Sequence, residues 1–88
     1  MISREYLRRK ILEGNFVRLG QLLEYWPPTL WAEALSQRES NTLKKINGTY
    51  GFILRDALEL SKYFSVAFET MIELVDAEME HRKLNKKR

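Results

Sequence analysis

The chain contains 88 residues, of which 44% are hydrophobic and 31% are charged. That length suits a single core, so we expect residues 1–88 to form one domain. The absence of cysteine excludes disulfides and thiolate metal sites, and no apolar run after Met1 has the length of a secretory signal. No segment approaches the ~20 apolar residues of a membrane span. We therefore expect a cytoplasmic protein that does not enter the membrane.

The positive charge is concentrated in three stretches of the chain. The net charge is +3, yet five basic residues lie between positions 82 and 88, and without them the remainder would be negative. The other two stretches are residues 4–10 and residues 38–45. Local clusters matter more than the total for binding a polyanion. We interpret the basic tail 82–88 as the solvated, frayed end of a helix, with a binding role as the alternative.

Two helices are predicted before the first prolines. Ser3 is a suitable N-cap for a basic helix over residues 3–13, whose Leu7 and Ile11 share one face. Its basic residues either follow a phosphate backbone or form a solvated face. Asn15 then caps a second helix. Its apolar stripe consists of Phe16, Leu19, Leu22, Leu23 and Trp26.

Pro27 and Pro28 end the second helix, because proline lacks the backbone donor that helix interiors need. Proline is tolerated at the first position of a helix, so a third helix is predicted from Pro28 to Leu35. It should bury Leu30 or Trp31 together with Ala34 and Leu35. A polar break over residues 36–40 follows.

Ser40 or Asn41 is expected to cap a short fourth helix. In this helix Leu43 and Ile46 should point inward, and the neighbouring polar side chains should point outward. Asn47 and Gly48 end it, since Gly48 can adopt left-handed backbone angles. The alternative is that these two residues turn a β-hairpin, but the flanking residues do not alternate as strands do.

Two longer helices complete the predicted fold. The pattern of residues 52–63 predicts a central helix with one buried and one solvated side. The inward residues are Leu54, Ala57, Leu58 and Ser61, and the outward ones are Arg55, Asp56, Glu59 and Lys62. Ser65 should cap the last helix, whose stripe is Phe68, Met71, Ile72, Val75 and Met79. The sequence thus predicts an all-α bundle of five to six short helices.

Residues 16–75 resemble the helix-turn-helix domain of phage repressors, the family that includes the Cro and repressor proteins of temperate phages. The resemblance is carried by two short helices around a polar turn at residues 28–47, ending in Asn-Gly. It is also carried by the pattern Leu-x-x-Ala-Leu-x-Leu-Ser-x-x-Phe-Ser-Val over residues 54–66. The chain differs at Pro28 and Thr29, where the family usually has a phosphate-anchoring polar residue. It also has Ser36 where the family's turn usually has glycine.

The resemblance implies a sequence-specific transcriptional regulator that binds double-stranded DNA through its second motif helix, as a homodimer and without a cofactor. Asn41, Thr42 and Lys44 would then face the bases in the major groove. Residues implied to contact phosphates are Thr29, Arg38, Lys45 and Tyr50. Two copies would double the contact, and the expected dimer surface consists of Met71, Val75 and Met79 on the last helix. The alternative for that surface is ordinary core.

Enzymatic function is not expected from these residues. The only histidine is His81, and without cysteine or a second histidine the usual nucleophile–base pairs and imidazole metal sites cannot form. No phosphate-binding glycine loop and no evident small-molecule site is present. The alternative function is a helical protein-interaction module, such as an antitoxin-like or regulatory adaptor protein. Its anchors would be Trp26, Trp31, Tyr50 and Tyr63.

Overall fold

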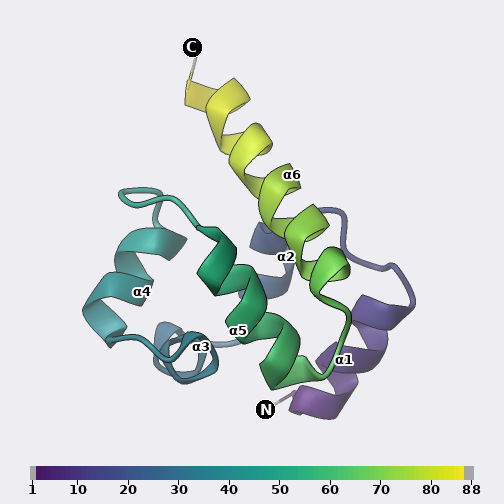
Figure 1. The fold of residues 1–88 in the computed structure, drawn as a ribbon. Coiled ribbons are helices and arrows are strands. Elements are labelled where there is room, and N and C mark those ends of the chain that lie inside the picture. The colour runs from purple at the N-terminus through teal and green to yellow at the C-terminus, as the bar shows by residue number, and fades with distance from the viewer. Residues whose placement is uncertain (1, 87–88) are drawn as a thin grey trace.

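The protein is all-helical over the residues described by the structure, a computed structural model that covers residues 2–86, with Lys86 described by its backbone alone. Six helices follow one another along this part of the chain, as Figure 1 shows. They are α1 (Arg4–Leu12), α2 (Leu19–Leu23), α3 (Pro28–Leu35), α4 (Glu39–Ile46), α5 (Leu54–Phe64) and α6 (Phe68–Lys86). The predicted all-α class is confirmed. None of these helices has the length and apolar character needed to cross a membrane.

Aromatic rings form the centre of the core. Trp26 and Trp31 lie with their ring centroids 4.8 Å apart, and Phe64 stacks 5.9 Å from Trp26. The indole nitrogens are both satisfied, since Trp26 donates to the carbonyl of Ile2 and Trp31 to that of Leu23. Two buried tryptophans with paired N–H groups fix how the surrounding helices pack. The alternative in which these indoles are exposed anchors for a protein partner is therefore wrong.

The ends of the early helices agree in part with their predicted positions. Ser3 caps α1 by accepting a hydrogen bond from the backbone N–H of Tyr6, and Leu7 and Ile11 are buried as expected. Pro28 occupies the first turn of α3. The predicted cap at Asn15 is wrong, because α2 begins only at Leu19. The apolar stripe nevertheless reaches the core, where Leu19, Leu22, Leu23 and Trp26 are buried and Phe16 packs against its edge.

Two serines adopt left-handed backbone angles at helix ends. Ser36 ends α3 with a φ of 56°, and Ser65 ends α5 with the same φ. Such angles strain a residue that has a Cβ atom, so each turn must be held by its surroundings. The prediction that Ser65 caps the last helix is wrong, because Ser65 closes α5 and α6 begins at Phe68.

The buried side of α5 differs from the predicted one. Ala57 and Ser61 are buried as expected, but Leu54 and Leu58 are 67% and 39% exposed. Asp56, predicted to be solvated, is fully buried. The buried face is built on Ala57, Leu60 and Phe64, and Asp56 lies beside it as an acceptor for groups from three segments.

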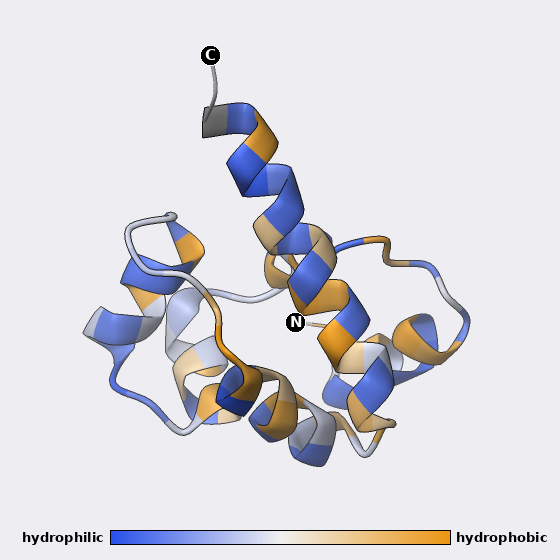
Figure 2. Cartoon of the chain, turned by 45° about the horizontal axis from the view of Figure 1, so that its top comes forward, coloured by the Kyte–Doolittle hydropathy of each residue, from blue (hydrophilic) through white to orange (hydrophobic). Residues whose placement is uncertain are grey.

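The last helix, α6, continues beyond the body of the molecule. Its first half packs on α5 and α2, while its second half extends outward (Figures 1 and 2). That second half is mostly hydrophilic, and Leu84 on it is 61% exposed. The interpretation of residues 82–88 as a frayed tail is wrong at Arg82, which lies in regular helix with a side chain only 18% exposed. Lys87 and Arg88 lie outside the described residues.

Candidate nucleic-acid interface

The helices α3 and α4 meet across a tight turn that is closed by backbone hydrogen bonds. The N–H of Ser36 donates to the carbonyl of Glu33, and the N–H of Gln37 donates to the carbonyl of Ala32. These bonds satisfy carbonyls at the end of α3 and allow α4 to begin at once. Arg38 precedes the first residue of α4, which is Glu39, so the predicted caps at Ser40 or Asn41 are wrong.

The inner face of α4 is mainly polar, contrary to the prediction. Thr42 is fully buried and Lys45 is 8% exposed, whereas Leu43 is 47% exposed. The predicted inward position of Leu43 is therefore wrong by one residue. Ile46 is the only predicted inward residue of this helix that packs against the core. The shift follows from Lys45, whose charge has a buried partner, so burying it is possible without leaving an isolated ion.

A buried ion pair joins α4 to α5. The Lys45 Nζ lies 2.7 Å and 2.8 Å from the two carboxylate oxygens of Asp56. Asp56 also accepts from the Gln37 side chain at 2.6 Å and from the backbone N–H of Ile53 at 2.9 Å. One carboxylate thus holds the α3–α4 turn, the inner face of α4 and the first turn of α5. This arrangement fixes how far α4 stands from the body.

Burial removes two residues from the predicted DNA contacts. Thr42 was expected to face bases and Lys45 to hold phosphate, but both point into the protein. A buried threonine cannot reach a base edge, and a lysine paired with a buried carboxylate cannot serve a phosphate. Neither position is retained in the interface.

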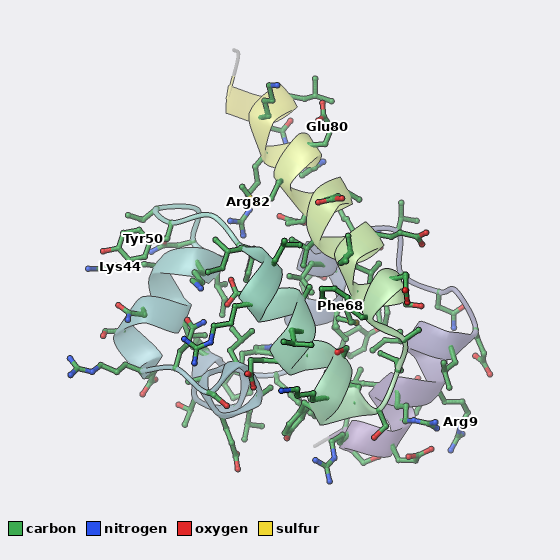
Figure 3. The ribbon with its side chains drawn as sticks, in the orientation of Figure 1. Arg9, Lys44, Tyr50, Phe68, Glu80 and Arg82 are labelled. Carbon is green, nitrogen blue, oxygen red and sulfur yellow. The ribbon has the colours of Figure 1, made fainter. Side chains whose placement is uncertain are left out.

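The remaining predicted residues are exposed and lie on α4 or beside it. Asn41 and Lys44 are exposed, and the Lys44 Nζ lies 3.5 Å from the hydroxyl of Tyr50 and 5.2 Å from its ring centre. Figure 3 shows the Lys44 and Tyr50 side chains pointing away from the body together. Arg38 is exposed, and Thr29 donates to a carboxylate oxygen of Glu39 at 3.0 Å.

Three exposed residues of α4 and its C-terminal end are not among the predicted contacts, and one of them, Leu43, was predicted to point inward. Ser40, Leu43 and Asn47 are exposed at positions i, i+3 and i+7 of one helical face, which also carries Lys44. No local pattern identifies Leu43 as an outward residue, because the residues that turn inward instead are a threonine and a lysine. The residue that determines which face of α4 turns inward lies outside the motif: it is Asp56, whose carboxylate pairs with Lys45.

The predicted dimer surface on α6 is also wrong in large part. Met71 is fully buried and Val75 is 5% exposed, so both belong to the core of one molecule. Met79 is half-buried, and its sulfur lies 3.4 Å from the backbone N–H of Phe52 as an acceptor. These side chains are used within the chain, as the alternative interpretation held.

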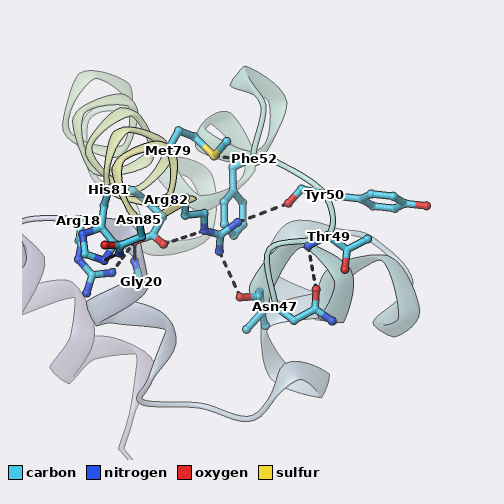
Figure 4. A network of polar contacts seen from close by, with 12 residues as sticks. Arg18, Gly20, Asn47, Thr49, Tyr50, Phe52, Met79, His81, Arg82 and Asn85 are labelled. Atoms are coloured by element: carbon cyan, nitrogen blue, oxygen red, sulfur yellow. Dashed lines mark hydrogen bonds and ion pairs between the residues drawn. The ribbon is translucent and has the colours of Figure 1, made fainter. Parts of the chain in front are cut away.

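A second buried carboxylate fixes the far end of α4. Glu78 on α6 accepts from the Arg18 guanidinium and the N–H of Gly20, each at 2.8 Å, and from Arg82 at 2.9 Å. Arg82 also donates to the carbonyls of Ile46 and Tyr50, at 3.2 Å and 3.4 Å (Figure 4). A cation at these carbonyls complements the negative C-terminal end of α4.

The electrostatic state of Glu78 follows from these contacts. Burial alone would raise the pKa of its carboxyl, but hydrogen bonds from Arg18, Gly20 and Arg82 and the charge of Arg82 lower it below 4.5. Glu78 is therefore ionised at neutral pH and holds both arginines. Among residues 2–86, no group of three or more His, Cys, Asp or Glu side chains is placed to bind a metal ion.

The chain matches no family model, and the comparisons with curated proteins and with solved structures found no match either.

Proposed function

We propose that α3 and α4 form the helix-turn-helix of a sequence-specific DNA-binding regulator of transcription. The observation that carries the proposal is the two-sided construction of α4. Its inner face is fixed to the body through Lys45 and Asp56, and its outer face presents Asn41 and Lys44 to solvent. A short, rigidly held helix with free polar side chains on one face suits insertion into the major groove.

Two further features support the resemblance to the phage-repressor domain. Ser36 adopts left-handed angles in the turn where that family usually has glycine. Leu35 and Thr42, rather than Leu43, are the buried residues on either side of the turn, which makes their spacing one residue shorter than the sequence pattern suggested. Both features favour a helix-turn-helix built from residues that are unusual for the family.

The roles of individual side chains follow from their chemistry and position. The Asn41 amide is suited to adenine, the Lys44 ammonium to guanine acceptors, and the exposed Leu43 to a thymine methyl group. Arg38 and Tyr50 flank these positions at the beginning of α4 and in the loop after it, where contacts to phosphates set the register. We propose a homodimer as the binding form, because two half-sites double the contact.

The alternative function, a protein-interaction module, has less support. Two of its four aromatic anchors, Trp26 and Trp31, are buried in the core. A third, Tyr63, is half-buried and is covered by the Arg4 guanidinium at 4.8 Å from its ring centre. Only Tyr50 remains well exposed, at 45%. One well-exposed side chain among the four expected anchors is weak support for a hot spot.

The test is selection of duplexes from a random pool, followed by a salt titration of the enriched duplex. We expect saturable binding that weakens steeply with salt, and an enriched site with two-fold symmetry. The Asn41→Ala/Lys44→Ala double variant should lose discrimination between this site and a scrambled duplex, by about 1–3 kcal/mol for each base contact. Its melting temperature should match that of the wild type, because both side chains are exposed.

The matched control is Arg9→Ala, which removes one positive charge on the side of the molecule away from Lys44 (Figure 3). It should leave the discrimination intact. Absence of binding to any duplex at low salt would overturn the proposal. Discrimination that is unchanged in the double variant would overturn the assignment of α4 as the reading helix.

A further inference from the structure

A groove lies between the loop after α4 and the second half of α6. Its volume is about 590 Å³, and its walls include Asn47 and Thr49 from the loop and Met79 and Lys83 from α6. Ile46, the last residue of α4, also lines it. The groove therefore opens directly beside the helix that we propose to read bases, and Figure 4 shows Arg82 between its two walls.

The second half of α6 carries both acidic and basic side chains. Exposed carboxylates belong to Glu73, Asp76 and Glu80, spaced three and four residues apart along one side of the helix. Arg82 and Lys83 both line the groove, and Figure 3 shows Glu80 and Arg82 pointing in opposite directions. Lys83 is three residues from Glu80 and seven from Asp76, so it lies where the groove borders the acidic side of the helix. The charged side chains that α6 contributes to the groove are therefore Glu78, Arg82 and Lys83.

The one carboxylate that lines the groove does not cancel the charge of Arg82 and Lys83. Glu78 is 4% exposed, and its two oxygens are bonded to Arg18, Gly20 and Arg82. One buried negative charge faces two guanidinium groups, so the cluster remains positive. Lys83 adds a further charge at the rim, and the structure gives it no ion-pair partner among residues 2–86.

The rim also offers neutral donors. Thr49 is exposed, and the Asn47 side chain accepts a hydrogen bond from the Thr49 N–H through its oxygen, which leaves its amide N–H groups directed elsewhere. A lysine, a hydroxyl and an amide around an open groove are the groups that commonly contact phosphate and sugar in protein–DNA complexes. The apolar part of the lining comes from Ile46, Met79 and Tyr50.

We propose that this groove seats the phosphate backbone of the duplex that α4 reads, with Lys83 as its principal contact. The inference rests on the proposed function and extends it, since it assigns to α6 a sequence-independent part of DNA binding. The second half of α6 then serves as a clamp beside the major-groove helix. Arg82 positions the loop wall of this groove through the carbonyls of Ile46 and Tyr50.

The test compares Lys83→Ala and Lys83→Glu with the wild type and with the control Arg9→Ala. Each protein is titrated with salt on two duplexes, one with the enriched site and one scrambled. Lys83→Ala should weaken binding to both duplexes by the same factor and reduce the slope of log K against log salt by about 1. Lys83→Glu should weaken both further, and Arg9→Ala should match the wild type.

The outcomes separate this inference from the proposed function. If the wild type binds with sequence discrimination, but both Lys83 variants keep its slope and affinity, the groove assignment is overturned and the reading helix stands. A loss confined to the enriched duplex would also overturn it, because Lys83 would then read bases. If the wild type binds no duplex, both proposals fail together.

Discussion

The helices α1 and α4 are both short and both lie on the outside of the bundle, yet they are attached to it by different forces. α1 is held by Leu7 and Ile11, which are 0% and 4% exposed. α4 is held mainly by Lys45, whose ammonium group reaches the carboxylate of Asp56 at 2.7 Å, while Ile46 packs against the edge of the core. The first attachment is non-directional and grows with buried area, whereas the second depends on one partner at one place.

The difference has a mechanical consequence for the proposed reading helix. An apolar contact tolerates small shifts, because its energy changes gradually with the area in contact. A buried ion pair tolerates only much smaller shifts, because either group without its partner is a buried, uncompensated charge. The polar attachment therefore holds α4 in one position relative to α5, as a helix that must match a groove requires.

The largest expected effect comes from breaking that attachment. Lys45→Ala should lower the free energy of unfolding by about 3–5 kcal/mol, because Asp56 would stay buried without its cation. The neighbouring Lys44 is exposed, so Lys44→Ala should change stability by less than about 0.5 kcal/mol. Urea unfolding followed by circular dichroism measures both. The two variants differ in position by a single residue and remove the same charge.

A double-mutant cycle with Asp56→Ala sharpens this comparison. The combined loss in Lys45→Ala/Asp56→Ala should be smaller than the sum of the single losses, by about 1–3 kcal/mol, since neither charge is then left alone. Additive losses would mean that the two residues act independently and that α4 is held by other contacts.

The second expected effect concerns pH and the far end of α4. Hydrogen bonds from Arg18, Gly20 and Arg82 hold the pKa of Glu78 in the folded protein below its ordinary value of 4.5, despite burial. Its contribution to stability is therefore fully present above pH 4.5 and is lost as pH falls through the lower, folded pKa. The free energy of unfolding of Glu78→Gln should therefore fall less steeply with decreasing pH than that of the wild type. Glu80→Gln, on the exposed side of the same helix, is the matched control.

Identical acid profiles for Glu78→Gln and the wild type would show that this carboxylate does not hold Arg18 and Arg82 in solution. Loss of the contact should also loosen the loop, since Arg82 donates to the carbonyls of Ile46 and Tyr50. Hydrogen exchange of the Tyr50 amide, which donates to the carbonyl of Lys44, measures that effect independently.

The contrast between the two helices also explains what the sequence predicted. Local signals predict the burial of Leu7 and Ile11, through their apolar spacing. They also predict the bounds of α3, through Pro28. No local signal predicts the inner face of α4, because Lys45 is buried only through its pairing with Asp56, which is eleven residues away in the next helix. Asn41 and Lys44 are on the outer face as predicted, since both are polar and neither has a buried partner. Thr42 and Lys45 were predicted on the wrong face, because contacts with residues distant in the sequence determine their burial.

The smallest expected effect is at Thr42, which faces the protein from the inner side of α4. Its Oγ1 is buried and has no hydrogen-bond partner among the described residues. Thr42→Val keeps the shape of the side chain and removes the unsatisfied hydroxyl, so it should raise the free energy of unfolding by about 1 kcal/mol. Urea titration should show a higher midpoint with an unchanged slope.

A loss of stability in Thr42→Val would contradict this account and would mean that the hydroxyl has a partner in solution, such as a bound water. The expected gain would instead show that α4 carries polar groups on its inner face beyond those its attachment needs. DNA discrimination should be unchanged in this variant, because Thr42 points away from the proposed reading face.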